Sequence, residues 1–213
     1  ATLPLTPYEL QFLPKALPIV VLAVFAYTKL SAMPRYMVLA ALLFSLAGDV
    51  SLALPFADSF ITGLACFFVA HLTYAMCFAL LHRRLQETPG DHIISRKPKW
   101  FISIIMISFA VMMAVHILPA SKALFYPVVA YISVITLMGL TAVWLAQTKL
   151  IVTGALFFVI SDAILAQSVF KTPLPLSTIW VMTTYYGAQY CLTMGLVDGF
   201  LRKENRQEEI GQT

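Results

Sequence analysis

The stretch FFVISDAILA, residues Phe157–Ala166, is apolar enough to lie in a membrane, yet it carries the acid Asp162 at its centre. A second apolar stretch, FSLAGDVSLAL at Phe44–Leu54, carries Asp49 in the same way. An ionised carboxylate in the middle of a bilayer costs about 2.5–3.5 kcal/mol on insertion scales, so such acids usually face a cavity and serve a function. The sequence therefore predicts a membrane-embedded site built around two aspartates.

The composition is that of a polytopic helical membrane protein. Of the 213 residues, 60% are hydrophobic and only 11% are charged, whereas soluble domains carry roughly 25% charged residues. The mean hydropathy is +0.85. The apolar stretches are long and repeated, which is typical of membrane-spanning helices and not of a soluble core or of a transmembrane barrel. We therefore expect an all-α transmembrane helical bundle.

Seven apolar stretches are close to the ~20 residues that a helix needs to cross the hydrocarbon core. The predicted spans are residues 14–30, 36–55, 60–81, 100–118, 124–146, 150–169 and 176–200. We expect residues 1–201 to form a single transmembrane domain. Residues 202–213 are expected to form a polar, disordered cytoplasmic tail.

The basic residues predict the orientation of this bundle. With the N-terminus outside, the inner side holds eleven of the 14 lysines and arginines, all except Lys15, Lys122 and Lys171. The positive-inside rule favours this arrangement, which makes the C-terminus cytoplasmic. The second and sixth spans then run parallel, and Asp49 and Asp162 both lie about 18–20 Å from the inner boundary at 1.5 Å per residue. The similar surroundings of the two acids also predict an internal parallel repeat.

Other polar side chains fall at compatible depths on four of the predicted spans. His71 and Tyr74 are three residues apart and share a helix face. Tyr185 and Tyr186 are spaced so that each can share a face with Gln189. The candidates for binding the substrate are therefore His71, Tyr74, Tyr185, Tyr186, Gln189, Ser45 and Ser161.

Each of these candidates also has a purely structural interpretation. A buried histidine, glutamine or serine often bonds between helices, and a tyrosine can simply pack or lie at the membrane interface. The two aspartates differ, because a structural role would require a buried basic partner and no lysine or arginine lies mid-span. No metal-ligand spacing, phosphate-binding loop, GxSxG or HExxH motif is present, so we expect neither a metal nor another cofactor. The basic residues lie in short loops, and we expect no nucleic-acid partner.

Two carboxylates in a dry, narrow site are suited to acid–base catalysis. Because they repel each other and lose hydration, one is expected to keep its proton while the other is ionised near neutral pH. Such a pair serves reactions that pass through an oxocarbenium-like state, with the two carboxyl groups facing one cavity at roughly 5–9 Å. We expect His71, Tyr185 and Gln189 to line this cavity. The substrate should be lipid-like, since the acids are more accessible from the bilayer than from water, and a vinyl ether meets both requirements.

Several ordered motifs resemble a known family. They are FSLAGD at 44–49, GLACFFVAHLTYAMCF at 63–78, GALFFVISDAILA at 154–166 and WVMTTYYGAQ at 180–189. The chain is similar in these motifs to the YhhN-like lysoplasmalogenase family of membrane proteins, and the resemblance covers residues 15 to about 195. The family pattern has eight spans, and residues 1–13 here are too short to supply the first of them.

The resemblance implies a membrane hydrolase that cleaves the vinyl ether bond of lysoplasmalogens. The products would be a fatty aldehyde and glycerophospho-ethanolamine or -choline, and Asp49 and Asp162 would be the essential acids. We expect one aspartate to protonate the β-carbon of the vinyl ether while the other stabilises the cation and deprotonates water. Asp162 is preferred as the acid, because Ile160 and Ala163 make its surroundings more apolar than Gly48 makes those of Asp49.

Two other functions are open on the sequence alone. Paired acids near the midplane also serve proton-coupled or lipid transporters. A non-catalytic lipid-binding protein is the second alternative, and it would keep its lipid after loss of either acid.

Overall fold

The computed structural model describes residues 12–86, 96–146 and 148–211, and within these ranges the chain contains helices and no strand. The long helices are α1 (Phe12–Lys29), α2 (Ala32–Ala53), α3 (Ser59–Gln86), α4 (Arg96–Ser121), α5 (Phe125–Thr141), α6 (Lys149–Phe170) and α7 (Ser177–Gly211). A short 3-10 turn, Lys122–Leu124, leads into α5, and a π-helical turn, Ala142–Ala146, follows it. The predicted all-α class is confirmed, and each predicted apolar stretch corresponds to one long helix.

The ends of the helices follow from the local sequence. Thr148 precedes α6, and its side-chain oxygen accepts a hydrogen bond from the backbone N–H of Ile151 at 3.3 Å, as a helix N-cap does. Pro34 lies in the first turn of α2, where its missing N–H is no loss. These two helices carry the two aspartates, so their starting points fix the depth of both acids.

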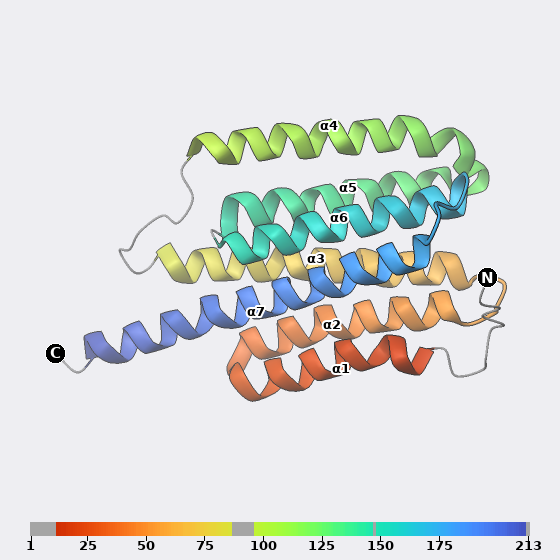
Figure 1. Ribbon diagram of the computed structural model, residues 1–213. Helices are drawn as coiled ribbons and strands as arrows, with labels where there is room; N and C mark the ends of the chain where they lie inside the picture. Colours follow the sequence, from red (N-terminus) through yellow and green to blue (C-terminus); the bar gives the residue numbers. More distant parts are fainter. Residues whose placement is uncertain (1–11, 87–95, 147, 212–213) are drawn as a thin grey trace.

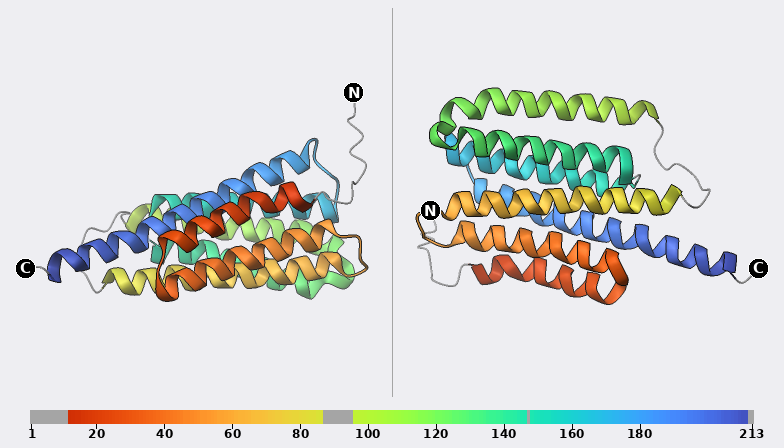
Figure 2. Two further views of the ribbon diagram at one scale, coloured as in Figure 1. Left: turned by 90° about the horizontal axis from the view of Figure 1, so that it is seen from below. Right: turned by 180° about the vertical axis from the view of Figure 1, so that it is seen from behind.

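The helices lie side by side along one common axis (Figure 1). α2 packs along α3 and α6 packs along α7, while α4 lies at one edge beside α5 (Figure 2). The α1–α2 turn, the C-terminal ends of α3 and α7 and the N-terminal end of α4 lie at one end of the bundle. Because this end carries Lys29, Arg35, Arg83 and Arg84, we call it the basic end. The α2–α3, α4–α5 and α6–α7 connections lie at the opposite end, which we call the far end.

Two pairs of helices, α2 with α3 and α6 with α7, approach closely at glycines. A β-carbon on Gly48 of α2 would overlap the ring of Phe67 on α3. On the other side of the molecule, a β-carbon on Gly195 of α7 would overlap the side chain of Ile151 on α6. Larger side chains at such contacts cost about 1–3 kcal/mol, so the two helix pairs that carry the acids are closely fitted.

Four described stretches are long and apolar enough to cross a membrane. They are Ala32–Ala53, Ser59–Arg84, Pro98–Ala146 and Lys149–Phe170. The third folds back at Lys122–Leu124 and comprises both α4 and α5. By the same measure α1 is only a shorter apolar helix and α7 is not a candidate, so neither the seven predicted spans nor eight are confirmed.

The sequence of α7 explains why it falls outside this set. Its middle carries polar side chains, among them Tyr185 and Gln189, and both are buried inside the bundle instead of facing lipid. α7 also continues to Gly211, so the prediction of a disordered tail is wrong for residues 202–211. The division into a domain at 1–201 and a tail at 202–213 stays a prediction, as does the internal repeat. Residues 1–11 and residues 87–95, between α3 and α4, lie outside the described residues.

Candidate active site

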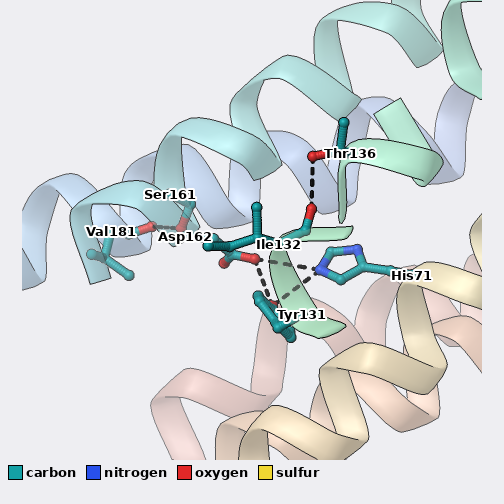
Figure 3. Close-up of polar contacts among 7 residues, drawn as sticks. All are labelled: His71, Tyr131, Ile132, Thr136, Ser161, Asp162 and Val181. Atoms are coloured by element: carbon teal, nitrogen blue, oxygen red, sulfur yellow. Dashed lines mark hydrogen bonds and ion pairs between the residues drawn. The ribbon is translucent and has the colours of Figure 1, made fainter. Parts of the chain in front are cut away.

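Asp162 belongs to a cluster of three polar side chains from α3, α5 and α6 (Figure 3). The hydroxyl of Tyr131 donates a hydrogen bond to Oδ2 of Asp162 at 2.6 Å. Nε2 of His71 lies 3.3 Å from the same Oδ2 and 3.1 Å from the Tyr131 hydroxyl. His71 is fully buried, whereas 15% of the Asp162 side chain is exposed. We call these three residues the Asp162 cluster. In it, Tyr131 and His71 hold the same carboxyl oxygen of Asp162 in place.

The hydrogen-bonding role of His71 follows from its surroundings. Its Nδ1 is buried and has no hydrogen-bond partner among the described residues. A buried N–H without an acceptor costs about 1–3 kcal/mol, so we assign a proton to Nε2. His71 then donates a hydrogen bond within the Asp162 cluster.

Asp49 is held from the other side of the bundle by α7. The hydroxyl of Tyr185 donates a hydrogen bond to Oδ2 of Asp49 at 2.8 Å. Tyr185 is buried, and its ring meets those of Phe67 and Phe158 edge-on, with centroids 5.9 Å and 5.5 Å away. Since packing fixes the tyrosine, the tyrosine in turn fixes the carboxyl group of Asp49.

The two acids line one cavity of about 230 Å³, as the sequence predicts. Asp49 and Asp162 line it together with Tyr185, the hydrogen-bond donor to Asp49. The lining continues toward the far end of the bundle with the hydroxyl side chains of Ser168 and Ser177. We call this the polar cavity. The predicted distance between the carboxyl groups stays a prediction.

A second cavity meets the polar cavity at Asp162. Its walls come mainly from α3, α4, α5 and α6, and almost all its lining side chains are hydrophobic. Leu52, Phe67, Leu165 and Asp162 line both cavities, whereas Asp49 lines only the polar one. We call the second space the apolar cavity. Asp162 therefore stands at the boundary between a polar and a hydrocarbon-like environment.

The predicted binding residues divide into two groups. Tyr185 and Ser161 line the polar cavity, although the Ser161 hydroxyl also donates to the backbone oxygen of Val181 at 3.1 Å (Figure 3). Tyr186 is half-buried, and its ring packs on that of Tyr185 with centroids 5.4 Å apart. His71 contacts Asp162 but does not itself line the polar cavity.

The other predicted residues lie in the interior, away from the lining of both cavities. Tyr74 and Gln189 are fully buried, and the tyrosine hydroxyl donates to Oε1 of Gln189 at 2.5 Å. Ser45 is fully buried as well. The expected contact of Gln189 with the cavity is therefore not found, because its amide is engaged by Tyr74 between α3 and α7.

Tyr131 is the residue of this site that the sequence did not predict. It lies in α5, whose sequence FYPVVAYISVITLMGLT is apolar almost throughout. A tyrosine hydroxyl in the middle of such a helix must find a partner in the protein, because lipid offers none. The sequence therefore indicates that Tyr131 has a hydrogen-bond partner, but it does not show which one. The packing of α5 near α6 makes Asp162 that partner.

The chemistry available here is that of carboxyl, imidazole and phenol groups. Among the described residues, no set of three or more His, Cys, Asp or Glu side chains is arranged to hold a metal ion. Two acids share a cavity, each with its own hydroxyl donor. This arrangement can donate a proton at one carboxyl group and accept one at the other.

Known proteins resemble the chain over most of its length. It matches the YhhN family over residues 10–196. Lysoplasmalogenase TMEM86B of Homo sapiens is 35% identical over 183 residues, which are 84% of this chain and 72% of the relative. The protein of the same name from Sus scrofa is 31% identical over 73% of this chain and 61% of its own length. Lysoplasmalogenase TMEM86A of Homo sapiens is 29% identical over 74% of this chain and 63% of its own length. No solved structure matches the chain significantly.

Proposed function

The chain belongs to the YhhN family, and we propose that it is a membrane hydrolase that cleaves the vinyl ether bond of lysoplasmalogens. The products are a fatty aldehyde and glycerophospho-ethanolamine or -choline. One observation carries this proposal: Asp162 borders both a polar cavity that holds a second acid and an apolar cavity. A lysoplasmalogen has the same division, with its vinyl ether between a polar headgroup and a hydrocarbon chain.

Asp162 acts as the acid in the proposed mechanism, because it is the acid that borders the apolar cavity. Its carboxyl group gives a proton to the chain-side carbon of the double bond. The electron pair of the double bond forms the new C–H bond and leaves an oxocarbenium ion at the oxygen-bearing carbon. As Asp162 becomes negative, the hydrogen bonds from Tyr131 and His71 to its Oδ2 strengthen and stabilise the developing charge.

Asp49 acts as the base, because it lines only the polar cavity, whose polar groups can hold the attacking water. Its carboxylate stabilises the cation and takes a proton from the water that attacks the oxygen-bearing carbon. The hemiacetal then collapses to aldehyde and alcohol, and the proton on Asp49 returns to Asp162 through the cavity that both acids line. Acid–base catalysis of this kind contributes typically 10²–10⁴-fold to a rate.

The test is aldehyde release by the purified protein from a vinyl-ether lysolipid. The control substrate is the saturated alkyl-ether analogue, which lacks the double bond that Asp162 would protonate, so it should yield no aldehyde. A folded protein that releases no aldehyde from either lipid would exclude the hydrolase. Lipid or proton flux through liposomes without chemical turnover would instead identify a transporter.

We also expect all seven helices to cross the membrane, with the basic end and the C-terminus in the cytoplasm. The C-terminal ends of α3 and α7 lie at the same end of the bundle (Figure 1), and a cytoplasmic excess of basic residues sets the orientation of membrane proteins. In a cysteine-free background, Arg83→Cys and Arg202→Cys should be labelled by a membrane-impermeant reagent from the same side. Lys171→Cys, at the far end, should be labelled from the opposite side. Labelling of the first two positions from opposite sides would contradict this topology.

A further inference from the structure

The apolar cavity extends along the helices from Asp162 toward both ends of the bundle. At the far end it reaches Phe170 of α6, and toward the basic end it reaches Met106 of α4. Met106 packs against Gly139 of α5. Gly139 follows Tyr131 by eight residues in the direction of the basic end, which is about 12 Å at 1.5 Å per residue. We call this region, beside Met106, the inner end of the apolar cavity.

The polar cavity indicates which of the two directions the hydrocarbon chain takes. From the acids it runs only toward the far end, where Ser168 of α6 and Ser177 of α7 line it. A lysolipid with its vinyl ether at Asp162 and its headgroup in this cavity therefore points its headgroup toward the far end. An extended lipid then places its chain in the opposite direction, toward the inner end.

The side chain that lines the inner end, Met106, is in close contact with a glycine. Met106 is 3% exposed and packs in a small cluster with Val143 and Val152. A β-carbon on Gly139 would overlap the sulfur and the terminal methyl group of Met106. Both atoms belong to the flexible end of that side chain, so the side chain can move. Met106 lines the cavity, whereas Gly139 contacts Met106 and does not line the cavity. We therefore expect a methyl group added at Gly139 to displace the Met106 side chain into the cavity.

We propose that the contact between Met106 and Gly139 closes the inner end of the apolar cavity and sets the longest alkenyl chain that the protein cleaves. The proposal rests on the proposed function, since it assigns the occupant of the apolar cavity as the hydrocarbon chain of the same substrate. Gly139 acts through Met106 and does not itself line the cavity. Changes at these two positions should accordingly act in opposite directions on chain-length preference.

The experiment measures kcat/KM for aldehyde release from vinyl-ether lysolipids that share one headgroup and differ in chain length. Gly139→Ala should lower kcat/KM for the longest accepted chains by about tenfold or more, the scale on which hydrophobic pockets discriminate single methylene groups. For lysolipids with shorter chains, kcat/KM should equal that of the unsubstituted protein. Met106→Ala should shift the preference to longer chains. Ile105→Ala is the matched control, because it shortens a half-exposed side chain next to Met106 on the same helix and should leave the profile unchanged.

Three outcomes would overturn the proposal while the hydrolase activity stands. One is an unchanged chain-length profile in both Gly139→Ala and Met106→Ala. Another is a shift of both variants in the same direction. The third concerns Ala166→Leu, which narrows the apolar cavity toward the far end. The proposal fails if this variant shortens the longest chain that is cleaved while Gly139→Ala does not. Should Gly139→Ala fail to fold in a thermal-melting assay, Met106→Ala tests the proposal alone. Absence of aldehyde release by the unchanged protein would reject the proposed function itself.

Discussion

Asp49→Asn and Asp162→Asn are each expected to reduce aldehyde release by at least about 10²–10⁴-fold, the contribution of a positioned acid or base. Asparagine keeps the shape of the side chain and an oxygen that can accept the hydrogen bond from Tyr185 or Tyr131. It cannot exchange the proton on which the reaction depends. Aldehyde production by the purified variants is the measurement, at a protein concentration high enough to detect the residual rate.

The stability of the same variants separates a catalytic role from a structural one. An amide carries no charge to desolvate, and active-site charges often trade stability for function, so the melting temperature should be unchanged or slightly raised. The two acids act as one unit, and the double variant should lose little more activity than either single variant. Substantial turnover by either single variant, in folded form, would reject the paired-acid mechanism even if the chain is a lysoplasmalogenase.

Tyr131→Phe is expected to lower kcat by about 10²–10³-fold, as the loss of one donor to a developing negative charge does. The phenol touches Oδ2 of Asp162 at 2.6 Å and acts through that carboxyl group, so Tyr131 is a positioning residue. Its loss should leave KM nearly unchanged, because the hydrogen bond strengthens as the acid gives up its proton. Adding the change to Asp162→Asn should cost little further activity.

Tyr126→Phe is the matched control for this change. Tyr126 lies near the start of the same helix and is 81% exposed, so removing its hydroxyl should alter neither kcat nor KM. Steady-state kinetics on both variants makes the comparison. A loss at Tyr131 that appears only in KM would show that the hydroxyl binds the substrate and does not support the acid.

The helices could be predicted from the sequence because a hydrocarbon environment imposes one requirement on every span. About 20 apolar residues are needed, and long apolar runs mark where they lie. The continuation of α7 to Gly211 has no such signal, because residues 202–211 are polar and give no apolar periodicity. The π-helical turn at Ala142–Ala146 was also not predictable, since its residues are as apolar as those of the helix before it.

The site could be predicted only in part. The sequence shows how deep in the membrane each residue lies, but not how each helix is rotated about its own axis. The sequence predicts Asp49, Asp162 and Tyr185 at one cavity, and all three line it. It predicts Gln189 there too, but the amide of Gln189 faces Tyr74 between α3 and α7. A helix that is hydrophobic on all sides, as α5 nearly is, carries no sequence signal for the face that turns inward. The packing of α5 against its neighbours therefore decides that Tyr131 meets Asp162.

The low hydropathy of α7 has a consequence for biosynthesis. A helix that is not apolar enough to be a candidate span needs protein partners to remain in lipid, and α7 follows α1 to α6 in the order of synthesis. Its Tyr185 and Gln189 find Asp49 and Tyr74 on helices synthesised much earlier. We therefore expect glycosylation mapping to show poor insertion of α7 when α2 and α3 are deleted. Assembly of the acid-bearing cavity would then be the event that retains α7 in the membrane. A nascent chain with an incomplete cavity would be recognisable to membrane quality control by its unpartnered polar segment.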